Sequence, residues 1–394
     1  MKKRKIYALI FYMLIFILIA VPNVVQATEN DEETNTYEII KEQKESFGIS
    51  QFLKETKKYG GEFLEDIDIS ETLNSAITGN IDNSKIYKKV LKIFGTEIQA
   101  SITTLISILI IAVIHSLLKA ISDNLENNNI SKIIYYAQYV LIATIIMSNF
   151  TDIIKMIKET ASNLVGFMNL LIPILITLMT YTGNIVTGGL LQPIILFMIN
   201  FIANIINTVL IPLVLVSAAL AIISKVSEKV EITKITKFFK SSVTWFLGIV
   251  LTIFVGVVSL EGTLSSSIDG ITAKTAKAAV SSIIPVVGKV LGDVVDSVLG
   301  CGVILKNAVG IVGIIVIIGI CVAPIIKLGT LTMIYNLAAG IIEPVADGKI
   351  VKLLEEMGGI FKLLFGILCT LSVMLIIGVT LVVKISNSGM MYKW

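Results

Sequence analysis

Arginine and histidine are nearly absent from this chain. Arg4 is the only arginine and His115 the only histidine among 394 residues. Nucleic-acid recognition favours arginine, whose planar guanidinium forms bidentate contacts with phosphate and guanine, so no nucleic-acid partner is expected. Zinc-dependent or serine–histidine catalysis needs more histidine than the chain contains. We interpret His115 as a packing or interfacial residue of the first span, although an ionisable group within a membrane can also be functional.

Cysteine and catalytic motifs are also scarce. Cys301, Cys321 and Cys369 are odd in number, widely spaced and without a CxxC pair, which argues against a disulfide framework or a metal cluster. No phosphate-binding loop, HExxH helix or GxSxG elbow occurs. No facing pair of aspartates is expected within spans, because loops or the amphipathic segment 261–306 contain Asp152, Asp269, Asp293, Asp296 and Asp347. The sequence therefore predicts no enzymatic activity and no cofactor.

Apolar residues dominate what is present. They make up 55% of the chain, only 15% of residues are charged, and the mean hydropathy is +0.88. This composition predicts an all-α, polytopic membrane protein that resides in the lipid bilayer. The first 27 residues, "MKKRK" followed by a long apolar run that ends in "VVQA", are typical of a signal peptide cleaved after Ala27. An uncleaved first anchor is the alternative.

Residues 28–97 have a different composition. From Thr28 to Thr96 there are 14 acidic residues against nine lysines, which favours an extracytoplasmic location because no positive-inside pressure acts there. The stretch "TENDEETNTYE" has almost no apolar residues and is predicted to be disordered. The later part predicts two or three short amphipathic helices, too small for an independent core.

Nine apolar stretches have roughly the 20 residues that cross about 30 Å of hydrocarbon. We expect about six spans in a first bundle over 98–260 and about three in a second bundle over 307–383. The run 190–224 carries no charge and is too long for one ordinary span, so we divide it at Asn207 and Pro212, although a hairpin that never crosses is an alternative. The expected spans are 98–118, 133–151, 164–182, 190–207, 208–224, 243–260, 307–327, 328–346 and 360–383.

Lysine placement predicts the topology. If Thr28 lies outside, five crossings place the segment 225–242 inside. This loop contains five lysines and two glutamates, so the positive-inside rule also places it in the cytoplasm. Continuing the count places 261–306 outside, 343–359 outside and the tail 384–394 in the cytoplasm.

The segment 261–306 is predicted to form an extracytoplasmic amphipathic hairpin that bends at Pro285. On a helix that begins there, Lys289, Asp293 and Asp296 form one narrow, internally compensated stripe opposite a broad valine face. The hairpin can lie in the outer interface, or its stripe can face a water-filled cavity between spans. Both remain open, and the three charged residues are candidate assembly or pore-lining positions.

A second candidate stripe lies in "FMINFIANIINTVL". Asn200, Asn204 and Asn207 follow one another at helical spacing and share one face. Such amides join helices through hydrogen bonds, or they line a wet path. They would form the path if the protein were a stand-alone transporter for a small solute. A membrane scaffold without a conduit is the remaining alternative.

The stretch "AKTAKAAVSSIIPVVGKVLGDVVDSVLGC" followed by "LKNAVG", together with the signal peptide, the acidic outer segment and the polytopic body, resembles stage III sporulation protein AE of endospore-forming Firmicutes. The resemblance covers essentially the whole chain and is most specific over 273–310. It implies a non-enzymatic subunit of a channel, or feeding tube, between mother cell and forespore, located in the mother-cell membrane around the forespore.

The same resemblance implies partners. These are other membrane proteins of the stage III sporulation A set, including a cytoplasmic ATPase and ring-forming subunits, and a forespore-side protein across the intermembrane space. The assembly is expected to sustain late forespore gene expression and forespore integrity. No catalytic residues follow from the family.

Overall fold

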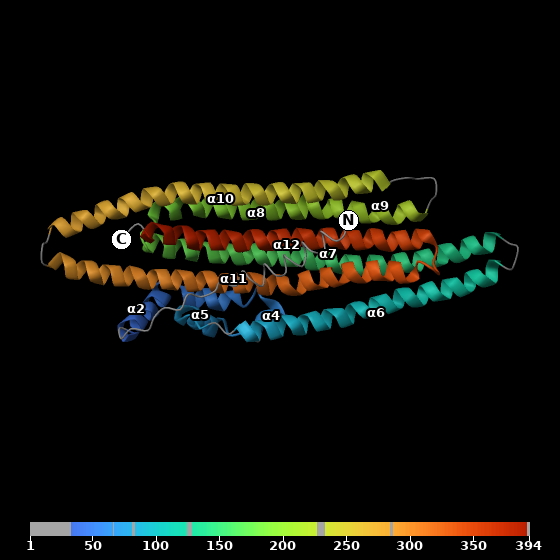
Figure 1. The fold of residues 1–394 in the computed structure, drawn as a ribbon, viewed down its shortest axis with the longest axis horizontal. Helices are drawn as coiled ribbons and strands as arrows, with labels where there is room; N and C mark the ends of the chain where they lie inside the picture. Colours follow the sequence, from blue (N-terminus) through green and yellow to red (C-terminus); the bar gives the residue numbers. More distant parts are fainter. Residues whose placement is uncertain are drawn as a thin grey trace.

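The computed structural model describes residues 33–65, 67–80, 83–123, 128–226, 233–283 and 287–391. This part of the chain is built from helices and contains no strand. Long helices lie side by side along one axis, and short N-terminal helices cover one side of the bundle (Figure 1). The helices are α2 (Glu33–Ser46), α3 (Ile49–Thr56), α4 (Gly61–Glu65), α5 (Ile69–Thr78), α6 (Asn83–Asp123), α7 (Asn128–Tyr181), α8 (Ile185–Ile205), the π-helical turn η1 (Ile206–Leu210), α9 (Ile211–Val226), α10 (Thr233–Ile283), α11 (Val287–Ile342) and α12 (Gly348–Met391).

Six helical rods in the described residues are long and apolar enough to cross a membrane. The architecture is therefore that of a multi-pass membrane protein. The sequence predicted nine spans, but the structure has six rods. The difference arises because three pairs of consecutive predicted spans each form one continuous rod. The apolar stretches are Ser84–Leu118, Tyr136–Tyr181, Ile185–Ser224, Lys234–Gly262, Ser297–Ile342 and Gly348–Lys384.

Helix α7 joins two expected spans because its charges occupy only one face. It runs for 54 residues without interruption, about 80 Å at 1.5 Å per residue. Ile153, Ile157 and Leu164 point into the core, whereas Asp152 and Lys155 lie on the exposed side. The prediction that Asp152 lies in a loop is therefore wrong, since an amphipathic helix tolerates charge on its outer face.

The expected break at Asn207 and Pro212 is replaced by a π-helical turn. The amide of Ile211 donates to the carbonyl of Ile206, five residues earlier, and α9 continues directly from there. A π-turn inserts one extra residue into a helix without ending it. Pro212, which has no backbone N–H to donate, follows directly after this turn. The run from Ile185 to Ser224 is thus one rod. Likewise, α11 passes through the expected boundary between 327 and 328.

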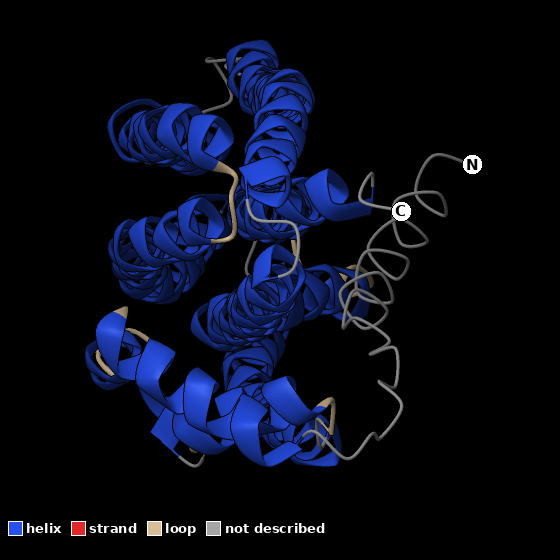
Figure 2. Cartoon of the chain, turned by 90° about the vertical axis from the view of Figure 1, so that its left-hand side faces the viewer, coloured by secondary structure: helices blue, strands red, loops and turns tan. Residues whose placement is uncertain are grey.

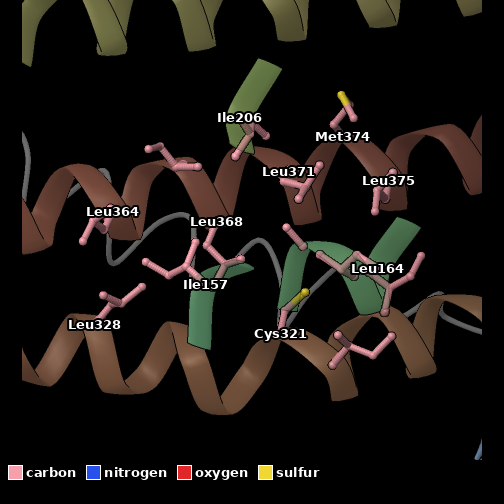
Figure 3. Packing of buried hydrophobic residues seen from close by; sticks show 14 of the residues in the cluster. Ile157, Leu164, Ile206, Cys321, Leu328, Leu364, Leu368, Leu371, Met374 and Leu375 are labelled. Carbon is pink, nitrogen blue, oxygen red and sulfur yellow. The ribbon is translucent and has the colours of Figure 1, made fainter. Parts of the chain in front are cut away.

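Helix α12 lies at the centre of the bundle. Its residues Leu364, Leu368, Leu371 and Leu375 are almost completely buried and face residues of α7 and α11 (Figure 3). One core cluster includes residues from all the long helices. The two bundles proposed from the sequence thus share a single core, because α12 packs against helices from both.

The N-terminal helices pack on α7 and α11 instead of forming a core of their own. Phe52 of α3 contacts Phe167 of α7 with ring centroids 6.2 Å apart, and Phe63 of α4 lies against Gly319 of α11. The short helices gather on one side of the bundle in the end view (Figure 2). Their buried residues join the main core, as expected for segments too small to fold alone.

Two details of the N-terminal segment differ from the prediction. Helix α2 begins at Glu33, inside the stretch expected to be disordered. Because adding residues to an existing helix costs little, the anchored part around Ile40, which is 4% exposed, supports this extension. In addition, residues 84–95 are not a separate helix but the first turns of α6.

The predicted hairpin 261–306 coincides with the ends of two long helices. Its first part continues α10 as far as Ile283, and its second part begins α11 at Val287. The two arms project together at one end of the molecule (Figure 1). Pro285 itself, the signal peptide 1–27 and the last residues of the tail lie outside the described residues. The extracytoplasmic location of the hairpin stays a prediction.

Candidate functional site

The asparagine stripe on α8 is divided by the structure. Asn200 is exposed and exchanges hydrogen bonds with Asn169 of α7, with Nδ2 of Asn200 3.1 Å from Oδ1 of Asn169. Nδ2 of Asn200 also donates to the carbonyl of Leu196 at 2.8 Å. Asn204 is exposed, and its carbonyl accepts the hydroxyl of Thr208. These two amides therefore lie on the outer surface, where Asn200 links α8 to α7.

Asn207 has a different environment within the π-turn η1. Its Oδ1 is buried and accepts no hydrogen bond from the described residues. A buried acceptor without a donor is destabilising, and π-turns are frequent at functional positions. Among the three asparagines of the stripe, Asn207 is the one whose side-chain position is least explained by structural packing.

The other candidate residues are only partly described. Lys289, Asp293 and Asp296 lie in the first turns of α11, and His115 lies within α6, but the side chains of all four are outside the described set. The assignment of Lys289, Asp293 and Asp296 as assembly or pore-lining residues stays a prediction, and so does that of His115 as a packing or interfacial residue. Farther along α11, Lys306 is fully buried.

Asp269 makes the most specific polar contact in the bundle. Its Oδ1 accepts the amide of Val186 at 2.9 Å, and its Oδ2 accepts the amide and the hydroxyl of Thr187 at 2.9 and 2.6 Å. Asp269 is 3% exposed. It lies within the segment 261–306, in the part that continues α10, and it caps the start of α8, a role that the sequence did not predict. A carboxylate suits this position, since the first amides of a helix lack partners and carry partial positive charge.

The chain approaches this cap through a tight turn. Gly183 has a φ of 92°, a left-handed conformation that glycine adopts without steric cost. The local candidate for the cap is Asn184, whose side chain makes no capping hydrogen bond. Asp269, 82 residues away from Thr187, takes that role instead. A sequence pattern cannot reveal such a cap, because the two helices that form it are distant in the chain.

A partly buried ion pair joins α10 to α12 toward the opposite end of the bundle. Nζ of Lys240 contacts Oε2 of Glu356, and the two side chains are 17% and 25% exposed. The same Nζ donates to the carbonyl of Glu356 at 3.3 Å. The sequence placed Lys240 in a cytoplasmic loop, but it lies in α10 and holds the start of α12.

Together these contacts fix how the rods stand against one another. Asp269 secures α8 to α10, the pair of Lys240 and Glu356 secures α10 to α12, and Asn169 and Asn200 join α7 to α8. The polar groups thus connect helices and give the bundle a defined shape, as expected for polar side chains within membrane bundles.

Two comparisons with known proteins identify the family of this chain. The family model of stage III sporulation protein AE matches residues 67–386. Stage III sporulation protein AE of Bacillus subtilis (strain 168) is 28% identical over 396 aligned positions, which cover 98% of this chain and 98% of that protein. No solved structure matches. The chain belongs to the stage III sporulation protein AE family.

Proposed function

We propose that the protein is a non-enzymatic membrane subunit of the channel that joins the mother cell to the forespore. Membership of the stage III sporulation protein AE family carries this proposal, since the match extends over residues 67–386 and implies a role in sporulation. The protein would reside in the mother-cell membrane that surrounds the forespore. The complex would sustain late forespore gene expression and forespore integrity.

The architecture supports an assembly role. The N-terminal helices, the turn between α7 and α8 and the arms of α10 and α11 gather toward one end of the molecule (Figure 1). In our proposal this end lies in the intermembrane space, where ring-forming subunits and a forespore-side protein would meet it. The opposite end, which contains the lysine-rich segment 225–242, would face the cytoplasm and an ATPase partner.

Deleting the gene in its native host tests the proposal. We expect cells that complete engulfment but lose late forespore reporter expression, with recovery when the wild-type gene is restored. Affinity purification of the tagged protein from sporulating cells should recover an ATPase and ring-forming partners. Normal spore formation in the deletion strain would contradict the proposal. Uptake of a small solute by proteoliposomes that contain this protein alone would favour a transporter instead.

A further inference from the structure

The exposed surface of α7 changes from apolar to polar near Asp152. Before this residue, the large side chains that α7 exposes are apolar, as at Val140 and Met147. In the described part of α7, no large apolar side chain is exposed again before Tyr181, which lies about 50 Å beyond Met147 along the helix. The exposed residues from Asp152 to Thr177 are all polar. They are Asp152, Lys155, Lys158, Glu159, Ser162, Asn169 and Thr177.

Helix α6 changes in the same way at a similar height. Ser101 of α6 and Asn149 of α7 bond residues of α11 that are only five positions apart. Before this level, α6 exposes Lys88 and Lys92 beside apolar residues. After it, the large side chains that α6 exposes are apolar, from Ile102 onward. On both helices the charged part is the one nearer the N-terminal helices and the arms of α10 and α11 (Figure 1).

The N-terminal helices show that water surrounds this charged part. Helix α3 covers α7 beyond Asp152, since Phe52 contacts Phe167 with ring centroids 6.2 Å apart. The outer side of α3 exposes three lysines, which are Lys54, Lys57 and Lys58. Hydrocarbon cannot solvate lysine side chains, so this side of the bundle stands in water from about Asp152 onward.

Helix α10 exposes its apolar surface at a different height. It lies along the upper edge of the bundle in Figure 1, whereas α6 lies along the lower edge. From Trp245 to Leu260, which are 72% and 68% exposed, the large exposed side chains of α10 are apolar. Its first turns instead mix lysines with aromatic and small polar residues, as is typical of the lipid headgroup layer. The exposed residues of these turns are Lys234, Ile235, Lys237, Phe238, Ser241 and Thr244.

Helix α12 lies between the two edges, so heights can be compared along it. The ion pair between α10 and α12 fixes one point of contact. A second point is Phe254 of α10, whose Cζ would lie 3.0 Å from a Cβ added at Gly378 of α12. The stretch 241–260 of α10 contains no charged residue. Between these two contacts, its middle lies near Leu371 of α12.

The corresponding stretch of α6 lies farther from the arms. Ser101 bonds a threonine of α11 that directly follows Gly329, and a Cβ added at Gly329 would lie 3.7 Å from Phe365 of α12. Helices α6 and α11 run in the same direction, opposite to α12 (Figure 1). The uncharged stretch 98–118 of α6 is therefore centred near Met357 of α12. The uncharged stretches of α6 and α10 are thus offset by about 20 Å along the bundle.

We propose that the bilayer crosses the bundle obliquely. It covers 98–118 of α6 and 133–151 of α7 on one side, and 241–260 of α10, nearer the arms, on the other. Helices α11 and α12 separate α6 from α10 by about 27 Å in all, at about 9 Å per helix contact. An offset of about 20 Å then corresponds to a tilt of about 35–40°, within the range of membrane helices. The inference does not depend on the proposed channel role.

The length of the uncharged stretches fits this tilt. Each stretch separates its flanking charges by about 32 Å along the helix, which is about 26 Å across a layer inclined by 35–40°. Lysine side chains at the ends of a span reach outward to the headgroups, so the protein matches a hydrocarbon layer of about 30 Å.

An upright bilayer fails at one edge or the other. At the height of the uncharged stretch of α6, it would immerse the exposed side chains of Lys237 in α10 and Glu355 in α12. At the height of the uncharged stretch of α10, it would immerse Lys155 and Lys158 of α7 and the lysines of α3. Charged side chains within hydrocarbon are costly, so the oblique layer, which leaves all of these in water or headgroups, is favoured.

Cysteine accessibility at two pairs of positions tests the tilt. Ser148 of α7 and Ser241 of α10 are exposed and lie at similar heights, near Gly359 of α12. Ser162 of α7 and Thr252 of α10 are also exposed and form a second pair, about 20 Å nearer the arms. An upright bilayer treats the two members of a pair alike, whereas an oblique one separates them.

The four cysteine variants are produced in vegetative cells and treated with a membrane-impermeant thiol reagent. We expect Ser162→Cys to react in intact cells and Ser241→Cys to react only after permeabilisation, since they stand in water on opposite sides. Ser148→Cys and Thr252→Cys should react at least tenfold less in both conditions, because lipid covers them. Labelling after denaturation shows that each thiol is present. The wild-type protein, whose three cysteines are buried, gives the background.

Equal labelling within either pair would overturn the proposal. Shielding of both Ser148→Cys and Ser241→Cys would indicate an upright bilayer at the height of α6. Shielding of both Ser162→Cys and Thr252→Cys would indicate one at the height of α10. A partner protein that covers α10 outside an upright bilayer would shield Thr252→Cys, but Ser241→Cys would then lie in lipid and stay unreactive, which also contradicts the tilt.

Discussion

The carboxylate of Asp269 accepts the amide of Thr187 at 2.9 Å, so a residue of α10 caps the first turn of α8. The same carboxylate also bonds the amide of Val186 and the hydroxyl of Thr187. The side chain of Asp269 thus accepts the hydrogen bonds of the first amides of α8, for which the side chain of Asn184 provides no acceptor. This contact sets the position of α8 relative to the projecting arm of α10.

Removing this cap should destabilise the bundle. We expect Asp269→Ala to lower the free energy of unfolding by about 2–4 kcal/mol, because three donors lose a charged acceptor in a buried site. Asp269→Asn should fall between this variant and the wild type, since its one carbonyl oxygen satisfies fewer donors. Thermal unfolding in detergent measures the effect. Asp152→Ala is the control, since its exposed carboxylate should change stability by no more than about 0.5 kcal/mol in detergent.

The contact between Lys240 and Glu356 should show non-additive behaviour. Lys240→Met and Glu356→Met should each cost about 3 kcal/mol, because each leaves a charge without its partner in a partly buried site. The double variant should cost less than either single one, since no unpaired charge remains. Thermal unfolding of the three variants in detergent completes the cycle. Additive losses would show that the pair acts as two independent groups.

Docking of the N-terminal helices depends on a close approach to α11. A Cβ added at Gly319 would lie 2.7 Å from Cδ1 of Phe63 and 3.4 Å from Cδ2 of Leu64, both in α4. We therefore expect Gly319→Ala to loosen the segment 33–80 and to raise its rate of proteolysis about tenfold, since overpacking costs about 1–3 kcal/mol. The apolar rods should remain intact.

The matched control for this change is Gly329→Ala in the same helix. A Cβ at Gly329 would meet Cε2 of Phe365 at 3.7 Å, an ordinary contact distance. This variant should be cleaved at the wild-type rate. If both alanine variants are cleaved equally fast, the position of α4 does not depend on the approach to Gly319.

Hydropathy and helical periodicity predicted the helical membrane class and the short N-terminal helices. They failed where helices are longer than a bilayer is thick. The charges of Asp152 and Lys155 resembled a loop, although they occupy only the outer face of α7. Asn207 and Pro212 resembled a break, but the chain accommodates them through a π-turn. The role of Asp269 depends on packing between distant segments, which no local pattern encodes.

The final prediction concerns topology, because six crossings and nine crossings place parts of the chain on different sides. Both counts leave 225–242 in the cytoplasm and 261–306 outside. If each of the six rods crosses once, however, the turn 343–347 faces the cytoplasm and the C-terminus lies outside, contrary to our count from the sequence. Lys349 and Lys352 follow that turn, and their retention inside agrees with the positive-inside rule. We expect Glu343→Cys, at an exposed position, to resist a membrane-impermeant thiol reagent in intact cells and to react after permeabilisation. A phosphatase fused after Trp394 should be active outside, and an inactive fusion together with labelling of Glu343→Cys in intact cells would support an odd number of crossings.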